Sequence, residues 1–151
     1  GLMITNGEPY VIEYNCRLGD PETESVLPRL SCDFVELCRA VASRRLDEAT
    51  VTISTDVAAT VMMVSGGYPG DYEKNKPITG LGHEAGSLVF HAGTAPLPVN
   101  GDVVTAGGRV VAVTALAPTM DKALELCYDR ASRINFDGMY FRRDIGRDLC
   151  S

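Results

Sequence analysis

The spacing of apolar residues changes near Leu46, and this change limits the folds open to the chain. Upstream, a hairpin pattern gives way to apolar residues at helical spacing, whereas downstream they occur in short alternating runs separated by glycine and proline turns. Helices followed by a block of strands are typical of an α+β fold with an antiparallel sheet. We therefore predict two units: residues 1–48, and a small antiparallel β-rich unit over residues 49–151 with one helix.

The first unit is expected to begin with a hairpin and to continue into two helices. Its turn is Asn6-Gly7, a pair that favours tight hairpins. Asp20 and Asp33 precede helical patterns and are good N-caps, and Pro21 suits a first helical position. The expected elements are strands over residues 1–5 and 10–17 and helices over residues 21–30 and 34–45.

The second unit is expected to hold short strands and one amphipathic helix, which Thr119 caps and which ends near Ile134. Cys38, in the first unit, and Cys127, in this helix, lie on apolar helix faces and are expected to be buried. The expected strands cover residues 50–53, 58–64, 87–93, 103–105, 109–116 and 139–142, the last after a turn at Asp137-Gly138.

Composition narrows the class of protein. The 151 residues include 20 acidic and 14 basic side chains, a net charge of −6 that disfavours general binding to nucleic acid or to an anionic membrane. The longest apolar stretch, near residues 57–64, is too short for a bilayer span, and no basic-then-apolar leader opens the chain. Five cysteines without a C-x-x-C pair favour a reduced, cytoplasmic protein. His83 and His91 lie apart, so neither is expected to bind metal or to act in catalysis.

Three polar side chains alternate along the strand expected over residues 10–17: Glu13, Asn15 and Arg17. Residues two apart on a strand point to the same face, so a carboxylate, an amide and a guanidinium would share one surface. Oxygen ligands suit Mg²⁺, which takes one or two protein groups and completes its shell with water and substrate phosphates. A guanidinium nearby can grip a phosphoryl oxygen, as phosphoryl transfer requires. The alternative is a solvent-facing strand with a simple Glu–Arg pair.

The ten residues from Glu13 to Glu22, Glu-Tyr-Asn-Cys-Arg-Leu-Gly-Asp-Pro-Glu, resemble the signature of the phosphoribosylamine–glycine ligase family of the ATP-grasp superfamily. Other ATP-grasp ligases share Glu-x-Asn-x-Arg, whereas Gly19-Asp20-Pro21-Glu22 separates this family from biotin-carboxylase-like relatives. The resemblance covers nearly the whole chain, because it continues in the family's order through residues 67–72, 90–94, 107–110, and 136–138 with 142–146.

The resemblance implies the C-terminal portion of an ATP-grasp domain followed by the small β-rich domain. It implies a ligase that uses ATP to activate glycine as glycyl phosphate, which the amine of 5-phosphoribosylamine attacks to give glycinamide ribonucleotide. Glu13 and Asn15 then correspond to ligands of Mg²⁺ or Mn²⁺, and Arg17 to the cation at the transferred phosphoryl. The chain alone is expected to be inactive, since the adenine contacts would lie upstream of Gly1. Fusion to other purine-pathway enzymes stays open.

The acidic turn at Asp20 and Glu22 and the glycine-rich loop can each be interpreted in two ways. Asp20 and Glu22 either orient a substrate amine or serve the helix, as its N-cap and as a negative charge near its N-terminus. The loop Gly66 to Gly70 either cradles a phosphate or is an ordinary glycine-rich turn. For the whole chain, the rivals are another ATP-grasp carboxylate–amine ligase and a non-catalytic β-rich binding or scaffold domain.

Overall fold

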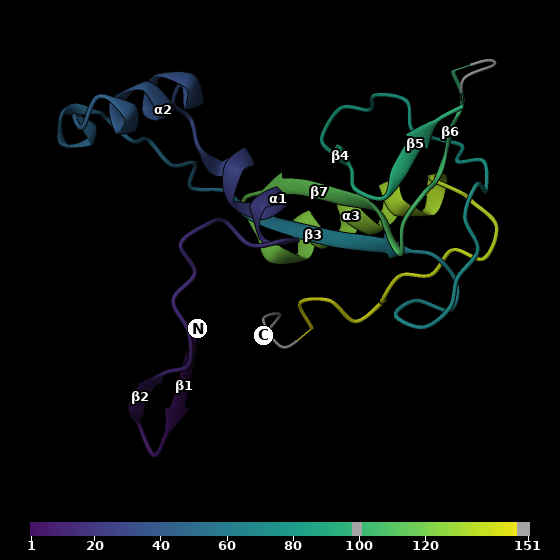
Figure 1. The fold of residues 1–151 in the computed structure, drawn as a ribbon, viewed down its shortest axis with the longest axis horizontal. Helices are drawn as coiled ribbons and strands as arrows, with labels where there is room; N and C mark the ends of the chain where they lie inside the picture. Colours follow the sequence, from purple (N-terminus) through teal and green to yellow (C-terminus); the bar gives the residue numbers. More distant parts are fainter. Residues whose placement is uncertain (98–100, 148–151) are drawn as a thin grey trace.

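A three-stranded antiparallel sheet forms the centre of the computed structural model, which describes residues 1–97 and 101–147 (Figure 1). Strand β7 (Arg109–Ala117) lies between β3 (Val57–Val64) and β4 (Leu88–His91). Residues 110–115 of β7 are buried without a break, as expected for a strand that is covered on both faces. The strands expected over residues 58–64, 87–93 and 109–116 are confirmed, with shifts of one or two residues at their ends.

Helix α3 (Met120–Arg133) covers one face of this sheet and closes the hydrophobic core. Thr119 caps the helix as expected, accepting a hydrogen bond from the Lys122 backbone N–H at 3.4 Å. Cys127 is buried as expected, and its thiol donates to the Ala59 carbonyl at 3.0 Å. This burial raises the pKa of the thiol to about 11. The core therefore joins α3 to β3 and β7 through apolar packing.

Helix α1 (Thr23–Val26) and its short 3₁₀ continuation η1 (Leu27–Arg29) are a shortened form of the helix expected over residues 21–30. Thr60 of β3 and Thr114 of β7 are register partners that alternate with core residues, so their hydroxyls point away from α3. Ser25 Oγ lies 2.6 Å from Thr60 Oγ1, which lies 2.8 Å from Thr114 Oγ1. Helices α1 and α3 therefore cover opposite faces of the sheet.

The expected hairpin is confirmed as β1 (Leu2–Thr5) and β2 (Glu8–Val11), with Asn6 and Gly7 at φ values of 53° and 85°. These values are typical of the type I′ turn that Asn-Gly favours. The strand expected over residues 10–17 is wrong beyond its start. The ladder pairs Leu2 with Val11, and Gly1 then exchanges backbone hydrogen bonds with Ile12 and Glu13. Residues 14–17 follow as irregular chain.

Helix α2 (Phe34–Ala42) begins as expected after Asp33, whose carboxylate accepts hydrogen bonds from two backbone N–H groups at 2.8 and 3.1 Å. The helix ends before residue 45 because Arg44 adopts a left-handed backbone conformation with a φ of 56°. A short 3₁₀ turn, η2 (Leu46–Glu48), follows. Within the described ranges, none of the helices combines the length and the apolarity of a membrane span.

The burial expected for Cys38 is wrong. Its side chain is exposed, as are Phe34 and Val41 on the same face of α2. Figure 1 shows the reason, because α2 and the hairpin extend away from the sheet, and the described part of the chain leaves this apolar face uncovered. Cys16, Cys32, Cys38 and Cys127 are free thiols, and Cys150 lies outside the described residues.

Shorter extended segments complete the fold. Strands β5 (Thr94–Pro96) and β6 (Val103–Thr105) form a separate two-stranded ribbon, in which β6 is confirmed and β5 is too short to give a strand pattern of its own. The strands expected over residues 50–53 and 139–142 are wrong, because each meets its neighbour at one bridge and not along a ladder. These bridges join Leu30 to Ile53 and Val64 to Tyr140.

The loop Gly66 to Gly70 is a turn held by close backbone contacts. A Cβ on Gly66 would lie 2.5 Å from the Gly138 carbonyl oxygen, and Gly67 has a φ of 96°. The preceding Ser65 donates its backbone N–H to the Gly108 carbonyl at 2.8 Å. Packing thus accounts for these glycines, which favours the ordinary-turn interpretation over a phosphate cradle.

Replacing Gly66 by alanine tests this interpretation. The added methyl would press on the Gly138 carbonyl, so we expect Gly66→Ala to lower the free energy of unfolding by about 1–3 kcal/mol. Gly82→Ala is the matched control, since a Cβ there meets no atom within 4 Å, and its effect should stay within about 0.5 kcal/mol. Chemical denaturation followed by circular dichroism measures both. Equal effects would contradict the packing argument.

Candidate functional site

Glu13 and Asn15 bring their side chains together directly after the hairpin. Asn15 Nδ2 donates to Glu13 Oε1 at 3.4 Å, and both residues are exposed. The strand expected to carry them is not formed, yet the carboxylate and the amide still converge. With the amide turned to present its oxygen, the pair offers two oxygen donors of the kind that Mg²⁺ and Mn²⁺ prefer. The donor set therefore fits a divalent ion whose other ligands are water and phosphate oxygens.

Arg17 lies at the end of the same irregular segment. Its Nη1 donates to the carbonyl of Leu18 at 3.0 Å, and the residue is exposed. Among the described residues, Arg17 and Glu13 do not form an ion pair with each other, so the simple Glu–Arg pair is not formed. The guanidinium is thus open to an anionic group in solution, which its planar fork suits.

The turn formed by residues 19–22 is closed by its own backbone. Gly19 is buried, and a Cβ on it would lie 2.1 Å from Glu22 Oε1, so the Glu22 side chain folds back over the glycine. Thr23 donates both its backbone N–H, at 3.1 Å, and its hydroxyl to the Gly19 carbonyl. The two contacts from Thr23 fix the turn where α1 begins.

The helix-cap interpretation of Asp20 is wrong. Glu22 occupies the N-cap position of α1 without a side-chain hydrogen bond, and Asp20 contacts the sheet instead. Arg109, the first residue of β7, donates from Nη2 to Asp20 Oδ2 and from Nη1 to the Asp20 carbonyl, both at 3.1 Å. A local pattern shows no pairing between residues this far apart, so Arg109 is a site residue that sequence reasoning missed. The available signal was its place in the motif at residues 107–110.

A cavity of about 310 Å³ lies beside this ion pair. Pro21, Tyr68, Arg109 and Arg142 contribute to its wall. The rest of the lining is mostly apolar and comprises Val61, Met62, Val64, Tyr140, Phe141 and Ile145. The turn of residues 19–22 therefore borders a hollow built from β3, the start of β7 and the C-terminal segment.

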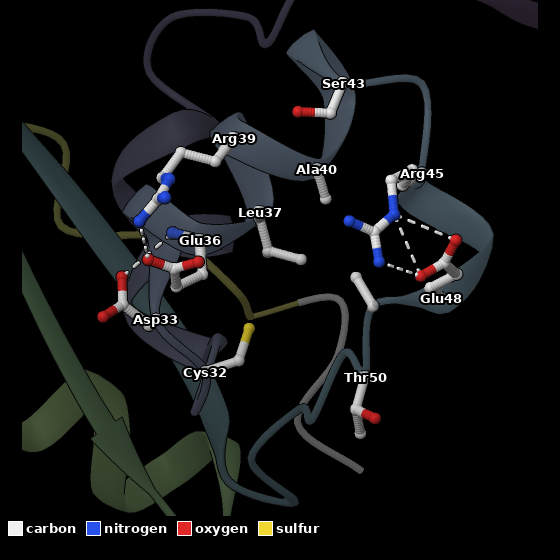
Figure 2. Close-up of a pocket in the computed structure, with 11 residues that line it drawn as sticks. Cys32, Asp33, Glu36, Leu37, Arg39, Ala40, Ser43, Arg45, Glu48 and Thr50 are labelled. Atoms are coloured by element: carbon white, nitrogen blue, oxygen red, sulfur yellow. Dashed lines mark hydrogen bonds and ion pairs between the residues drawn. The ribbon is translucent and has the colours of Figure 1, made fainter.

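A second hollow, of about 360 Å³, lies against α2 and η2 (Figure 2). Its charged side chains already pair with one another: Arg39 with Glu36 at 2.8 Å, and Arg45 Nε with the Glu48 carboxylate at 3.0 Å. None of the predicted site residues lines it. This hollow is therefore separate from Glu13 and the other predicted site residues.

Larger metal clusters are absent from residues 1–97 and 101–147, where no group of three or more His, Cys, Asp or Glu side chains is placed to hold an ion. His91 Nδ1 lies 3.0 Å from Thr94 Oγ1 in a local contact. Any divalent ion held by this part of the chain would thus have few protein ligands and would depend on a bound substrate, as Mg²⁺ commonly does.

Comparison with known proteins identifies the family. The sequence model of the phosphoribosylglycinamide synthetase C domain matches residues 58–148. A phosphoribosylamine–glycine ligase from Vibrio cholerae is 48% identical over 150 residues, which cover 97% of this chain and 34% of that protein. The ligase from Escherichia coli K12 is 47% identical over 149 residues, with the same two coverages. A bifunctional purine biosynthetic protein from Schizosaccharomyces pombe is 43% identical over 146 residues, which cover 96% of this chain and 18% of that protein.

The fold agrees with these sequence matches. The crystal structure of a phosphoribosylamine–glycine ligase from Thermotoga maritima matches with a TM-score of 0.77 and 35% identity, over 95% of this chain and 35% of that one. The expected α+β fold, the end of an ATP-grasp domain followed by a small antiparallel β-rich domain, is thereby confirmed. The chain spans about a third of the length of the curated ligases it matches. It belongs to the phosphoribosylglycinamide synthetase family and includes that family's C domain.

Proposed function

We propose that this chain is the C-terminal part of a phosphoribosylamine–glycine ligase that acts in de novo purine biosynthesis. The glycine carboxylate attacks the γ-phosphorus of ATP, giving glycyl phosphate and ADP. The amine of 5-phosphoribosylamine then attacks the acyl carbon and releases phosphate, giving glycinamide ribonucleotide. Family membership across nearly the whole chain is the observation that carries this proposal.

The metal end of the site is assigned to Glu13 and Asn15. Their head groups lie within 3.4 Å of each other on an exposed segment, so both can reach one ion. A bound Mg²⁺ or Mn²⁺ would neutralise negative charge on the nucleotide phosphates. The carboxylate supplies the charge that attracts the ion, and the neutral amide supplies a second oxygen.

Arg17 is assigned to the phosphoryl group that moves from ATP to glycine. Its exposed guanidinium is held at one nitrogen by the Leu18 carbonyl, and its other donors can reach an anionic oxygen. A planar fork placed at the transferred group stabilises the charge that builds up there during transfer. Arg17 is the residue of this chain to which we assign a catalytic role.

Asp20 and Glu22 are assigned to the amino substrates. As carboxylates on one short turn, they can attract the ammonium of glycine or the amine of 5-phosphoribosylamine. The alternative role of Asp20 as a helix cap is removed by the geometry of α1, whereas its carboxylate remains about half exposed beside Arg109. This favours substrate contact for the turn.

The proposed ligase function also implies a domain division, a cellular location and a set of partners. We assign residues 1–48 to the end of the ATP-grasp domain and residues 49–151 to the small β-rich domain. We assign the enzyme to the cytoplasm, with small molecules as its partners. Fusion to a second purine enzyme is a further option, since one relative is a bifunctional purine biosynthetic protein. The isolated chain should be inactive, because the ligases it matches are about three times as long.

Glu13→Gln in the full-length protein tests the metal assignment. Glutamine keeps the size of the side chain and removes its charge, so ligase turnover should fall at least about a hundredfold while the fold survives. Glu8→Gln is the control, because Glu8 is an exposed carboxylate on the preceding hairpin and should leave turnover unchanged. Release of phosphate from ATP with glycine and 5-phosphoribosylamine is the readout. Turnover within a few-fold of wild type at saturating Mg²⁺ would falsify the assignment.

Arg17→Lys tests the phosphoryl assignment. Lysine keeps the positive charge and loses the planar fork, so turnover should fall more than the affinity for ATP. Steady-state kinetics with varied ATP separate the two quantities. An unchanged kcat with only a raised KM for ATP would place Arg17 in ground-state binding of the nucleotide.

A further inference from the structure

Arg109 holds Asp20 at two points. One guanidinium nitrogen contacts the side-chain carboxylate and the other contacts the main-chain carbonyl, each at 3.1 Å. A single contact would leave the side chain or the backbone free to rotate. Because the guanidinium is planar, contacts at both nitrogens fix the backbone position of Asp20 and the direction of its carboxylate together.

The base of Arg109 is itself immobilised. Its carbonyl accepts the Gly93 backbone N–H at 2.8 Å, and the next residue, Val110, is fully buried. Gly108 on the other side packs under the Tyr68 ring, where a Cβ would lie 2.1 Å from a ring carbon. The guanidinium therefore extends from one of the most constrained parts of the sheet.

The same strand also holds the segment that follows the turn. Thr114, five residues further along β7, connects through the Thr60 hydroxyl to Ser25 of α1. Arg29 donates to the Ser54 carbonyl at 3.2 Å. The turn of residues 19–22 is thus fixed by Arg109 and the helix after it is fixed by hydroxyl contacts, so the small domain sets the position of both.

Stability does not account for the Asp20–Arg109 pair. The side chains are 56% and 38% exposed, and ion pairs this exposed add little to folding because water screens them. The structure thus has a two-point contact that contributes little to stability, placed at a turn assigned to substrate. A contact of this kind is expected where a carboxylate must be oriented toward a bound substrate.

We propose that Arg109 is a positioning residue of the ligase, which orients the Asp20 carboxylate toward the amino substrate without touching that substrate itself. The inference rests on the proposed function and deepens it, because it names what the small domain contributes to the site. Because Arg109 acts through Asp20, changing either residue should reduce ligase activity in the same way, by leaving the Asp20 carboxylate misplaced.

The test uses the full-length protein with Arg109→Gln, Arg109→Lys, Asp20→Asn and the double variant Arg109→Gln/Asp20→Asn. Arg109→Gln should lower kcat/KM for the amino substrates by about tenfold to a hundredfold, with KM for ATP and Tm close to wild type. In the double variant, kcat/KM for the amino substrates should fall no further than in the more impaired single variant, because both substitutions break the same contact. Lysine, which keeps one of the two contacts, should restore part of the loss. Arg133→Gln is the control, since Arg133 is an exposed, ion-paired arginine on α3 and should match wild type.

Losses that multiply in the double variant, or no rescue by lysine together with a lowered Tm, would overturn the inference. Hydrogen exchange gives a readout that does not depend on activity. Amide exchange at residues 19–23 should be faster in Arg109→Gln than in wild type, and unchanged exchange would also overturn the inference. If wild type makes no glycinamide ribonucleotide, the proposed function fails, and the exchange measurement still decides whether Arg109 holds the turn.

Discussion

Strand β7 is the constraint on which the other elements depend. Six consecutive buried residues in the middle of a sheet require cover on both faces, since neither face can remain in water. Helix α3 covers one face with apolar side chains, and α1 covers part of the other through a chain of hydroxyls. Helix α1, which follows the motif of residues 13–22, is therefore packed on the sheet, and Arg109 at the start of β7 reaches Asp20 in the turn before it.

Local patterns predicted the elements whose partners the chain itself supplies. The alternation in β3, the apolar run of β7 and the Thr119 cap were sufficient to predict β3, β7 and α3. These three elements pack against one another in one core. The helical pattern of α2 predicted an apolar face that exists, but periodicity does not say what covers it, and Cys38 is exposed. The strand expected over residues 10–17 is formed only in its first residues, because alternation of side chains does not say how far a ladder of backbone hydrogen bonds extends.

The candidate site was predictable in its residue types and less so in its geometry. Glu13 and Asn15 converge although the strand that should align them is not formed, so their proximity does not depend on the local structure from which it was predicted. Asp20 satisfies the sequence rules for a helix cap, yet its carboxylate pairs with Arg109, a residue 89 positions away. A long-range ion pair outweighed a local preference here, and no pattern within one segment contains that information.

Nucleotide binding with and without metal tests the central claim, that Glu13 and Asn15 join a divalent ion to ATP in the full-length protein. Calorimetry with a non-hydrolysable ATP analogue would be run in excess Mg²⁺ and in EDTA, for wild type and Glu13→Gln. The account predicts that Mg²⁺ tightens binding at least about tenfold in wild type, a coupling of about 1.4 kcal/mol, and has little effect in the variant. Equal affinities with and without Mg²⁺ in wild type would contradict it.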